Sequence, residues 1–470
     1  MSHSGNNEYS FKSTKQHAGN LTPIDIYRQL PGKKKFLLES TFQHQKKGKF
    51  SFIGANPYQE IIGNGPRTTV ITCEKDTRVM VDQHALDYLK EHLPKIELDF
   101  HFPFYGGAVG YIGYDSIRLH EDIGNMLPDN LDMPDIHFMV FKDIIVFDHT
   151  DKTISLIVLN HNLQADTILD DRLEQLKKVL SKSIEPLIQQ KANLDFQAEM
   201  TEKKFIENVN IAKTHLEQGD VFQVVLSQRF SAKMDVDPLS FYQKLREANP
   251  SPYMFYIDFA SYLLLGASPE SLVQTTGQEI VTNPIAGTRA RGKSQAEDEA
   301  LATELLQDEK EIAEHRMLVD LSRNDLGRVC EVGSITIPTY MTIEKYQHVM
   351  HIVSEVKGVL RRDLSSIDAL IACLPAGTVS GAPKIRAMQL INELEEKKRG
   401  VYGGGIGFIN FNHDLNIALA IRSLVIKDKQ AILQSGAGIV YDSDAKMEYQ
   451  ETLNKAKSIM EVNRYDPVSR

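Results

Sequence analysis

The sequence predicts an α+β fold of two interlocked domains, built on packed antiparallel β-sheets with helices outside them. Three regions, residues 138–159, 253–281 and 402–440, are rich in β-branched and aromatic side chains. Links of hairpin length separate the runs within each region, which favours antiparallel pairing over parallel strands joined by helical crossovers. The segments between these regions carry apolar residues at helical spacing, so helices are expected to cover the sheets.

The strand regions contain turns at definable positions. In the first region, runs at 138–146 and 153–159 flank the polar segment 148–151, and this pattern predicts a β-hairpin. The second region is expected to form a meander. In the third region, turns are predicted at 412–414 and 427–429, where polar residues interrupt the apolar runs.

Helix signals lie between the strand regions. Gly219 follows one amphipathic segment as a C-terminal cap, Pro383 opens another segment, and Gly400 ends that segment. Pro186 interrupts a third segment. Helices are therefore predicted over residues 163–191, 201–218, 294–326, 383–398 and 444–460.

The change from strands to a charged helical segment predicts a domain boundary. Residues 1–20 are polar and lack the apolar core of a signal peptide, so we expect a flexible N-terminal tail. Residues 21–160 are expected to form an N-terminal domain and residues 161–200 a helical linker. Residues 201–461 are expected to form a second, larger domain.

Composition narrows the class of protein. The chain has 470 residues, of which 42% are hydrophobic and 25% charged, as is typical of a globular protein. A net charge of −10 disfavours a general nucleic-acid binder. No uncharged apolar run approaches the ~18–20 residues that span a bilayer, so no membrane association is expected. Cys73, Cys330 and Cys373 are far apart, which indicates a reducing, cytoplasmic compartment and no disulfide framework.

Residues 287–294, with the sequence GTRARGKS, match the G-x-x-x-x-G-K-[ST] pattern of a phosphate-binding loop. Three features argue against nucleotide hydrolysis. Arg289 and Arg291 are bulky for a loop whose backbone must wrap a phosphate, the acidic run 297–299 opens the next helix, and no parallel sheet is predicted. Nucleotide hydrolysis is kept as an alternative that micromolar binding of ATP would support.

Two predicted helices carry glutamate pairs at i, i+3, a spacing that places both carboxylates on one helix face. Glu311 and Glu314 form one pair, and Glu448 and Glu451 form the other. A Mg²⁺ ion prefers a few carboxylates together with water and an anionic substrate, so two such faces could form an open magnesium site. Solvated charged helix faces are common, and spacing alone does not separate the two interpretations.

Several longer motifs occur in one order along residues 20–461. They are NPIAGTR (283–289), EHRMLVDLSRND (314–325), PAGTVSGAPK (375–384), YGG (402–404), IALAIR (417–422) and QSGAG (434–438). Together they closely resemble the chorismate-utilising enzymes, specifically the anthranilate synthase component I family. The resemblance implies a Mg²⁺-dependent carbon–oxygen lyase of tryptophan biosynthesis, which converts chorismate and ammonia into anthranilate and pyruvate.

The resemblance also implies roles for individual residues. Glu314 and Glu451 would hold Mg²⁺ on the ring carboxylate of chorismate, with Glu311 and Glu448 close by. Glu270 matches the general acid that protonates the departing C4 hydroxyl. The positions that match chorismate contacts are Gly287, Thr288, Tyr402, Arg422, Gly436, Ala437, Gly438 and Lys455.

His351 matches the histidine that the family uses for acid–base catalysis, in the elimination of pyruvate. Two alternatives stay open for it, a packing histidine or a metal pair with His348 at i, i+3. A further alternative for the whole chain is a catalytically silent sensor of chorismate or tryptophan. The presence of Glu270, Glu314, His351 and Glu451 disfavours that alternative.

Two positions separate the members of the family. Ala286 stands where aminodeoxychorismate synthases carry a nucleophilic lysine, and Gln223 stands where isochorismate and salicylate synthases carry a lysine that activates water. Neither side chain supplies that chemistry, which leaves ammonia as the nucleophile. Ala290 replaces the proline that is usual in the family, and this predicts a looser loop around Arg291.

The sequences LLES (37–40) and NPSPYM (249–254) resemble the two halves of the family's tryptophan site. Tryptophan, the end product of the pathway, would act there as a feedback inhibitor. Ordinary strand core is the alternative for Leu37 and Leu38. The expected contacts of tryptophan are Ser40, Pro252, Tyr253 and Met254.

The source of ammonia is expected to lie outside the chain. Cys330 and Cys373 stand in sequence contexts that indicate buried structural thiols and not catalytic nucleophiles. We therefore expect a separate glutaminase subunit, anthranilate synthase component II, in a heterotetramer with this chain. The chain alone is expected to use ammonium salts but not glutamine.

Overall fold

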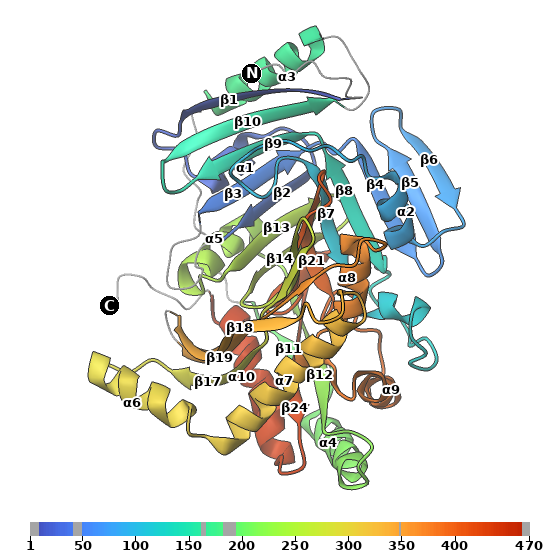
Figure 1. Cartoon of the computed structure of the whole chain (residues 1–470), viewed down its shortest axis with the longest axis vertical. Coiled ribbons are helices and arrows are strands. Elements are labelled where there is room, and N and C mark those ends of the chain that lie inside the picture. The colour runs from blue at the N-terminus through green and yellow to red at the C-terminus, as the bar shows by residue number, and fades with distance from the viewer. Residues whose placement is uncertain (1–8, 41–48, 161–165, 182–193, 347–348, 463–470) are drawn as a thin grey trace.

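Two large antiparallel sheets form the framework of the protein (Figure 1). The computed structural model describes residues 9–40, 49–160, 166–181, 194–346 and 349–462. Each sheet contains twelve strands, and helices surround them. The predicted α+β class with packed antiparallel sheets is confirmed.

The first sheet combines strands from distant parts of the chain. Its order is β1 (Ser10–His17), β10 (Thr153–Asn160), β9 (Asp143–Asp148), β3 (Phe50–Ala55), β2 (Lys34–Glu39), β13 (Tyr253–Phe259), β14 (Leu263–Ser268), β23 (Ser423–Lys427), β24 (Gln430–Ile439), β12 (Gln223–Lys233) and β11 (Gln197–Ala198). The short β20 (Gly381–Ala382) also pairs with β12.

The second sheet also combines strands from distant parts of the chain. Its order is β17 (Ile285–Ala290), β19 (Val349–Val359), β16 (Glu279–Thr282), β15 (Ser271–Thr276), β22 (Leu415–Leu419), β21 (Gly405–Asn410), β7 (Gly107–Ile112), β8 (Ile136–Phe141), β4 (Gln59–Asn64), β5 (Arg67–Thr72) and β6 (Thr77–Val81). β18 (Thr336–Lys345) pairs with β19. Segments 21–160 and 201–461 thus contribute strands to both sheets.

Each predicted strand region is divided between the two sheets. The run 138–146, expected as one strand, ends at Phe141 in the second sheet and resumes at Asp143 in the first. Both halves are buried, so their apolar pattern did not show which sheet each would join. The meander 253–281 likewise divides after β14. The predicted hairpin of β9 and β10 and the turns at 412–414 and 427–429 are confirmed.

Residues 10–17 correct the expectation of a flexible tail over 1–20. They form β1, which pairs antiparallel with β10 along its whole length, from Ser10 opposite Asn160 to His17 opposite Thr153. Without β1, β10 would present unpaired backbone groups at the edge of the first sheet; β1 covers them and is itself the edge strand.

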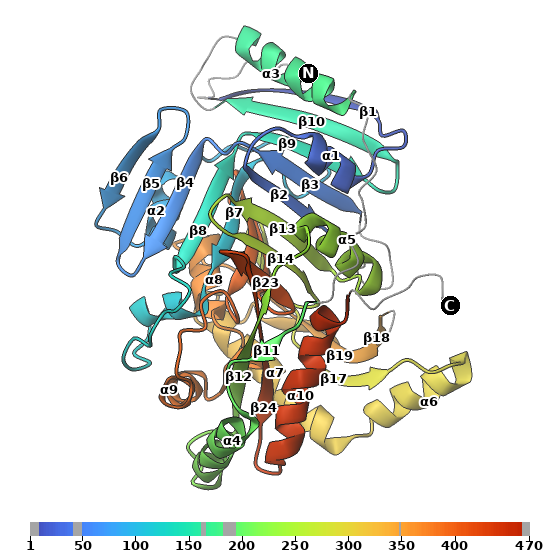
Figure 2. The same ribbon diagram turned by 180° about the vertical axis from the view of Figure 1, so that it is seen from behind.

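The helices connect and cover the sheets. They are α1 (Pro23–Gln29), α2 (Ala85–His92), α3 (Asp166–Leu180), α4 (Glu202–Glu217), α5 (Pro238–Ala248), α6 (Gln295–Leu305), α7 (Glu309–Gly327), α8 (Ser366–Cys373), α9 (Lys384–Leu394) and α10 (Ala445–Met460), with 3₁₀ turns at Tyr114–Leu119 and Gly377–Val379. Seen from behind, α10 runs along β24 beside α4 (Figure 2). No helix in the described ranges is long and apolar enough to cross a membrane.

Capping explains where the predicted helices begin and end. Thr201 and Asp444 accept hydrogen bonds from the first turns of α4 and α10, and both predicted helices are confirmed. The expected helix 294–326 is two helices, because the Asp308 side chain caps a new start for α7. The expected helix 383–398 ends at Leu394, and the part of 163–191 that is described is helical only over α3.

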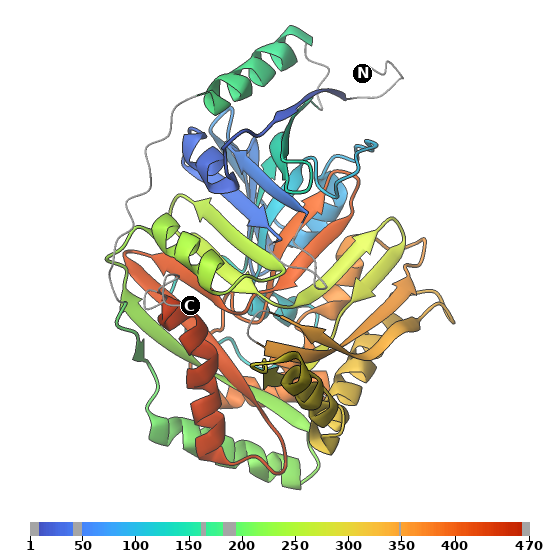
Figure 3. The same cartoon turned by 90° about the vertical axis from the view of Figure 1, so that its left-hand side faces the viewer.

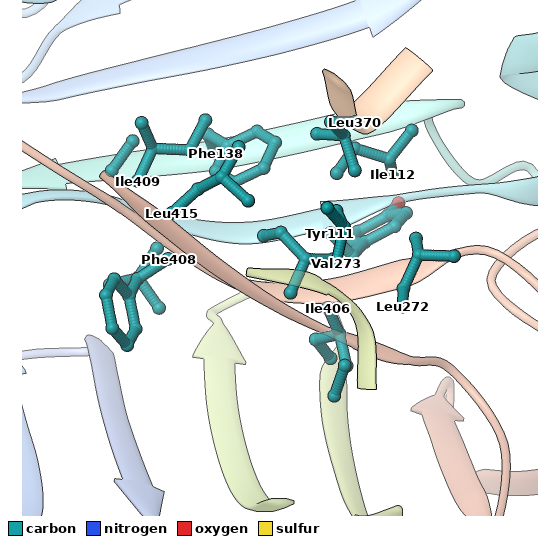
Figure 4. Close-up of a cluster of buried hydrophobic side chains, with 14 of the residues drawn as sticks. Tyr111, Ile112, Phe138, Leu272, Val273, Leu370, Ile406, Phe408, Ile409 and Leu415 are labelled. Atoms are coloured by element: carbon teal, nitrogen blue, oxygen red, sulfur yellow. The ribbon is translucent and has the colours of Figure 1, made fainter. Parts of the chain in front are cut away.

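The core lies between the sheets and between each sheet and the helices that cover it. Phe52 of β3 contacts Phe408 of β21 across the sheets, with ring centroids 5.9 Å apart. Side chains of β7, β8, β15, β21 and β22 gather with Leu370 of α8 in one buried cluster (Figure 4). Removing this apolar surface from water is the main favourable contribution to folding.

We expect Phe138→Ala to lower the free energy of unfolding by about 3–5 kcal/mol, because Phe138 is fully buried in this cluster and truncation leaves a cavity. The urea concentration at the unfolding midpoint measures this change. Met80→Ala on the exposed face of β6 is the control, and we expect it to change the midpoint little. Equal midpoints for wild type and Phe138→Ala would contradict the assignment of this core.

Candidate active site

At the centre of the candidate site, the chain passes from one sheet to the other at two places. We call these two links crossings, and they are hydrogen-bonded to each other. Glu270 lies in the link from β14 to β15, and Arg422 lies in the link from β22 to β23. The N–H of Ala267 donates to the carbonyl of Arg422 at 3.0 Å, and the N–H of Leu419 donates to the carbonyl of Glu270 at 3.0 Å. Each crossing therefore fixes the backbone of the other.

Arg422 is held in an unusual conformation. Its φ of +49° lies in the left-handed region, which is uncommon for a residue with a side chain. Its Nη1 donates to Ser458 Oγ of α10 at 2.7 Å. Burial lowers the pKa of the Arg422 guanidinium, while nearby Tyr402 and Glu451 act in the opposite direction. A buried cation beside Tyr402 and Glu451 is suited to receive an anion.

Lys455 adds a second cation to this region. Its Nζ donates to the carbonyl of Gly436 at 3.0 Å and forms an ion pair with Glu451 Oε1 at 2.7 Å. A Cβ on Gly436 would lie 2.8 Å from the Tyr402 hydroxyl, so only glycine permits this close approach. Gly436, Ala437 and Gly438 all lie in β24, opposite β12.

Tyr402 rests on a buried ion pair that sequence reasoning missed. Arg399 donates to both carboxylate oxygens of Glu395, at 2.8 and 2.6 Å, and its guanidinium lies 5.6 Å from the Tyr402 ring centroid. Burial raises the pKa of the Tyr402 hydroxyl to about 12. The spacing of Glu395 and Arg399 at i, i+4 was the available signal, although exposed pairs commonly share it.

Glu270 is a buried carboxyl group. Burial raises its pKa from 4.5 to about 7, and a hydrogen bond from Thr378 Oγ1 to Glu270 Oε1 at 2.8 Å, together with the charge of Lys455, limits that increase. Near neutral pH, a substantial fraction of this group therefore carries a proton that it can donate.

His351 of β19 is arranged to accept a proton. Its Nδ1 lies 3.0 Å from the carbonyl oxygen of Gly287 and 3.1 Å from Thr288 Oγ1. A carbonyl oxygen only accepts, so we assign the ring proton to Nδ1, which leaves Nε2 with its lone pair. Burial lowers the pKa of His351, and the charge of Arg422 lowers it further. His348, its possible metal partner, lies outside the described residues.

Gly287 makes the contact to His351 possible. The pairing of β17 with β19 shifts register between Ala286 and Thr288, so Gly287 forms a β-bulge, and its φ is +64°. A Cβ there would lie 3.2 Å from Glu311 Oε2. The glycine that matched the phosphate-loop pattern therefore belongs to a strand.

The rest of the phosphate-loop pattern is occupied by protein contacts. Arg291 Nε donates to Asp298 Oδ1 at 3.1 Å, and the N–H of Gly292 donates to the same oxygen at 2.7 Å. Arg291 Nη1 also donates to the carbonyl of Tyr346 at 2.5 Å. A carboxylate of α6 thus takes the place that a bound phosphate would need, and it holds Arg291, around which a looser loop was expected.

The four glutamates form two pairs, and Glu311, Glu314 and Glu451 each contact a different polar or cationic side chain. Gln223 Nε2 donates to Glu314 Oε1 at 2.9 Å, Arg289 contacts Glu311 at 3.3 Å, and Lys455 contacts Glu451. Burial raises the pKa of Glu311, and the charge of neighbouring Glu314 raises it further. In the described part of the chain, no three His, Cys, Asp or Glu side chains lie close enough together to hold a metal ion.

The chemistry of these groups nevertheless suits a hard divalent cation. Burial raises the pKa of Glu448, as does the charge of Glu451, and Lys310 at the start of α7 lowers it. The charge of Lys310 on α7 therefore acts on Glu448 of α10, so these two helices lie close to each other here. Glu448 Oε2 is buried and has no hydrogen-bond partner among the described residues. Carboxylate oxygens, one of them unpartnered, are the donors that Mg²⁺ prefers.

A cavity of about 250 Å³ has Thr288, His351 and Arg422 in its lining. Glu270 lines a different cavity, together with Thr378. In a side view, α10 (red) lies on the left of the lower half of the molecule, and β17, β19 and α7 (yellow to orange) lie on the right (Figure 3). Asn249, Pro252 and Ser458 also line the cavity of about 250 Å³. The sequence motifs did not indicate Ser458, and they placed Asn249 only in the segment 249–254 of the expected tryptophan site, because the partners of both residues come from distant segments.

Another cavity, of about 140 Å³, lies between the two sheets. All four predicted tryptophan contacts line it, namely Ser40, Pro252, Tyr253 and Met254. The second sheet contributes Phe408 and Asn416, which sequence reasoning missed. Ser40 Oγ and Asn416 Oδ1 are buried without a hydrogen-bond partner among the described residues, so the cavity offers polar atoms to a ligand.

A family profile of chorismate binding enzymes matches residues 33–461. The chain belongs to the chorismate-binding enzyme family. Within the family, the anthranilate synthase component 1 of Lactococcus lactis is 42% identical over 459 residues, which cover 95% of this chain and 98% of the relative. That of Acetivibrio thermocellus is 41% identical over 93% of this chain and 92% of the relative.

A solved structure supports the same placement in the chorismate-binding family. The crystal structure of anthranilate synthase component I from Streptococcus pneumoniae matches with a TM-score of 0.82 at 43% identity, over 95% of this chain and 99% of that chain. The predicted membership of the anthranilate synthase component I family is confirmed.

Glu270→Gln is expected to stabilise the folded protein more at about pH 8 than at about pH 5, by about 2–3 kcal/mol. In the folded protein the pKa of Glu270 is about 7, above its ordinary value of 4.5. Ionisation of Glu270 therefore lowers the stability of the wild type as the pH rises from 4.5 to about 7, and the full loss of stability is present above that pH. Urea unfolding at both pH values measures the difference.

Glu91→Gln on α2 is the control, because Glu91 is exposed. We expect this variant to differ little from wild type in stability, because substitutions of exposed side chains usually have small effects. A stability difference between Glu270→Gln and wild type that is the same at both pH values would show that Glu270 titrates normally.

Proposed function

We propose that the chain converts chorismate and ammonia into anthranilate, pyruvate and water with Mg²⁺, as the synthase component of an anthranilate synthase. The observation that carries the proposal is a cavity lined by the cation Arg422 and by His351, whose pKa is lowered. A protonatable Glu270 lies within electrostatic reach of a second cation, Lys455. This set suits a dianionic substrate whose reaction needs both an acid and a base.

Chorismate has two carboxylates, which need separate partners. Arg422 and Lys455 support binding of the enolpyruvyl carboxylate, because the planar guanidinium has further N–H donors beside the one bound to Ser458. Glu314 and Glu451 would hold Mg²⁺ against the ring carboxylate. When bound there, Mg²⁺ polarises the carboxylate and favours movement of charge into the ring.

The first step is addition of ammonia. Its lone pair forms a bond to ring C2, the ring double bonds shift, and the C4–O bond breaks. Glu270 donates its proton to the departing hydroxyl, which leaves as water, and the new ammonium group returns one proton. Gln223 and Ala286 support ammonia as the nucleophile, because neither can act as a base or an attacking amine.

The second step is elimination of pyruvate. His351 accepts the proton from C2 on Nε2, the C3–O bond breaks, and the ring becomes aromatic. The enolpyruvyl group takes a proton at its methylene carbon and leaves as pyruvate. Over both steps, the protons given and taken by the side chains balance.

We further propose that tryptophan binds in the cavity of about 140 Å³ and inhibits the reaction. Pro252 lines both this cavity and the one beside His351. In the same segment, Asn249 Nδ2 donates to the carbonyl of Ser458 at 2.5 Å, and Ser458 Oγ accepts from Arg422. A ligand that displaces residues 249–254 can therefore alter the position of Arg422, which is the coupling that inhibition requires.

We also propose that a glutaminase subunit supplies the ammonia, in a heterotetramer with this chain. The name component 1, which the relatives carry, supports a second component.

With chorismate, ammonium chloride and Mg²⁺, the pure chain is expected to form anthranilate, detected by its fluorescence, and with glutamine it is expected to form none. Glu314→Ala and Glu451→Ala should each lower the rate by about 100-fold or more, because a lost carboxylate weakens metal binding. Glu309→Ala, an exposed position on α7, is the matched control. Full activity of both variants in the presence of a chelator would refute the magnesium site.

Tryptophan binding can be followed through the fluorescence of tryptophan itself, since the chain contains none. Asn416→Leu is expected to weaken binding about tenfold, because it removes a buried polar atom that a ligand N–H can meet. Asn64→Leu, at an exposed end of β4, is the control. Unchanged affinity in Asn416→Leu, or an unchanged rate with tryptophan bound, would contradict the regulatory assignment.

A further inference from the structure

A buried ion pair beside Tyr402 takes no part in the chemistry proposed above. Arg399 is 3% exposed and Glu395 is 7% exposed, and Arg399 Nη2 lies 2.6 Å from Glu395 Oε1. Burial by itself lowers the pKa of the Arg399 guanidinium, but the charge of Glu395 raises it overall, so the guanidinium stays charged. A buried ion pair often contributes no more to stability than apolar side chains of the same size. The groups that this pair contacts therefore indicate its role.

Both members of the pair bind strand β12. Arg399 Nη2 donates to the carbonyl of Val225 at 2.7 Å, and Glu395 Oε1 accepts hydrogen bonds from the N–H and the Oγ of Ser227, both at 2.8 Å. In the register of β12 with β24, Val225 and Ser227 lie opposite two of the predicted chorismate contacts, both glycines of β24. The pair therefore fixes β12 where it lies beside the predicted substrate contacts.

Arg399 also holds the turn next to the candidate acid. Its Nη1 donates to the carbonyl of Val379 at 2.6 Å. Val379 closes the 3₁₀ turn Gly377–Val379, and Thr378 in the same turn donates to Glu270 Oε1 at 2.8 Å. The position of the Thr378 hydroxyl relative to Glu270 therefore depends on Arg399.

The flat face of the Arg399 guanidinium lies over two aromatic rings. Its central carbon is 4.7 Å from the ring centroid of Tyr114 and 5.6 Å from that of Tyr402. Cations are attracted to aromatic faces at these distances. Because the Tyr402 hydroxyl lies against Gly436 of β24, a shift of the guanidinium would move this predicted chorismate contact as well.

We propose that Arg399 is a positioning residue of the reaction, a proposal that rests on the proposed function above. It keeps Thr378 against Glu270 through the 3₁₀ turn, and it keeps Tyr402 in place through its planar face. A guanidinium can bond to Glu395 and to carbonyls on two further segments at once, because its donors form a rigid planar fork. The ammonium group of a lysine lacks this geometry, so lysine cannot replace Arg399 here.

The hydrogen bond from Thr378 affects the pKa of Glu270, and this effect has a definite sign. Burial raises that pKa to about 7, and the hydrogen bond opposes the increase. If Thr378 moves away, the pKa of Glu270 therefore rises further. Glu270 acts in its protonated form, so the rate falls as the pH rises through its pKa, and the loss of rate then moves to higher pH.

Other charged or titratable groups also lie around Glu270. Lys455 lowers the pKa of Glu270, the charge of Glu270 acts on Tyr346, and Asp325 lines the same cavity as Glu270. Arg399→Lys retains all three groups and also the positive charge at position 399. A change in the pH profile of this variant therefore reports a change in position and not a change in charge.

The test measures kcat for anthranilate formation from chorismate, at a saturating concentration of free ammonia, between about pH 6 and pH 9. Arg399→Lys is expected to lower kcat by about tenfold or more, and its alkaline loss of rate should move up by about one pH unit. Arg172→Lys is the matched control, because Arg172 of α3 likewise donates to a carboxylate, Asp143 at 3.2 Å, and to a carbonyl, Leu159 at 3.0 Å. Its kcat should stay within about twofold of wild type, with an unchanged pH profile.

A second variant serves if Arg399→Lys does not fold. Glu395→Gln/Arg399→Met removes both charges together, so no buried charge is left unpaired, and the fold is expected to persist. This variant also removes the hydrogen bonds to Val225 and Val379, and it should therefore show the same fall in kcat and the same shift in pH. Unchanged kcat in the folded double variant overturns the proposal. Failure of both variants to fold overturns it as well, because the pair would then be a folding element.

The remaining outcomes separate this proposal from the proposed function. A lower kcat with an unmoved pH profile overturns the proposal, because a purely structural pair would reduce the amount of active protein without changing the titration of Glu270. A wild type that forms no anthranilate refutes the proposed function instead. Urea unfolding of Arg399→Lys with and without Glu270→Gln, from about pH 5 to pH 9, then still measures the pKa of Glu270. A pKa equal to that of the wild type would refute the positioning role.

Discussion

The chemistry of the candidate site depends on a constraint of the backbone. Wherever the chain leaves one sheet for the other, its peptide groups lose their ladder partners and must find new ones inside the protein. The crossings at Glu270 and Arg422 provide these partners for each other, through the hydrogen bonds of Ala267 and Leu419. This arrangement brings an acid, Glu270, and a cation, Arg422, into the interior. Burial raises the pKa of Glu270 and lowers that of Arg422, and both shifts favour the neutral form of the group. The unusual φ of Arg422 persists because both sides of its crossing are fixed.

The carboxylates show how a protein can keep like charges close together before a ligand binds. Glu311, Glu314 and Glu451 each lie beside a different polar or cationic group, Arg289, Gln223 and Lys455 respectively. Every one of these contacts lowers the cost of burying negative charge. A bound cation could substitute for some of them, and Lys455 would then be available to a second anion.

The sequence was informative where the signal is local. Gly219 marked the end of α4, the predicted range 444–460 matches α10, and sequence motifs alone were enough to propose Glu270, His351 and Arg422 as site residues. Assignment of strands to sheets failed because both halves of a buried run look alike, whichever sheet they join. Ser458 and Asn416 could not be found for a related reason. Each is an ordinary polar residue whose significance depends on a partner or cavity formed by remote segments.

The interleaving of strands has a consequence for synthesis of the protein. β2 completes its pairing with β13, and β7 completes its pairing with β21, so the early part of the nascent chain emerges with two unsatisfied sheet edges. Those edges stay open until residues 253–259 and 405–410 leave the ribosome. The long interval exposes the growing polypeptide to aggregation and makes it a natural client for chaperones that shield strand edges. For the same reason, the two halves could not be expressed separately as independently folding fragments.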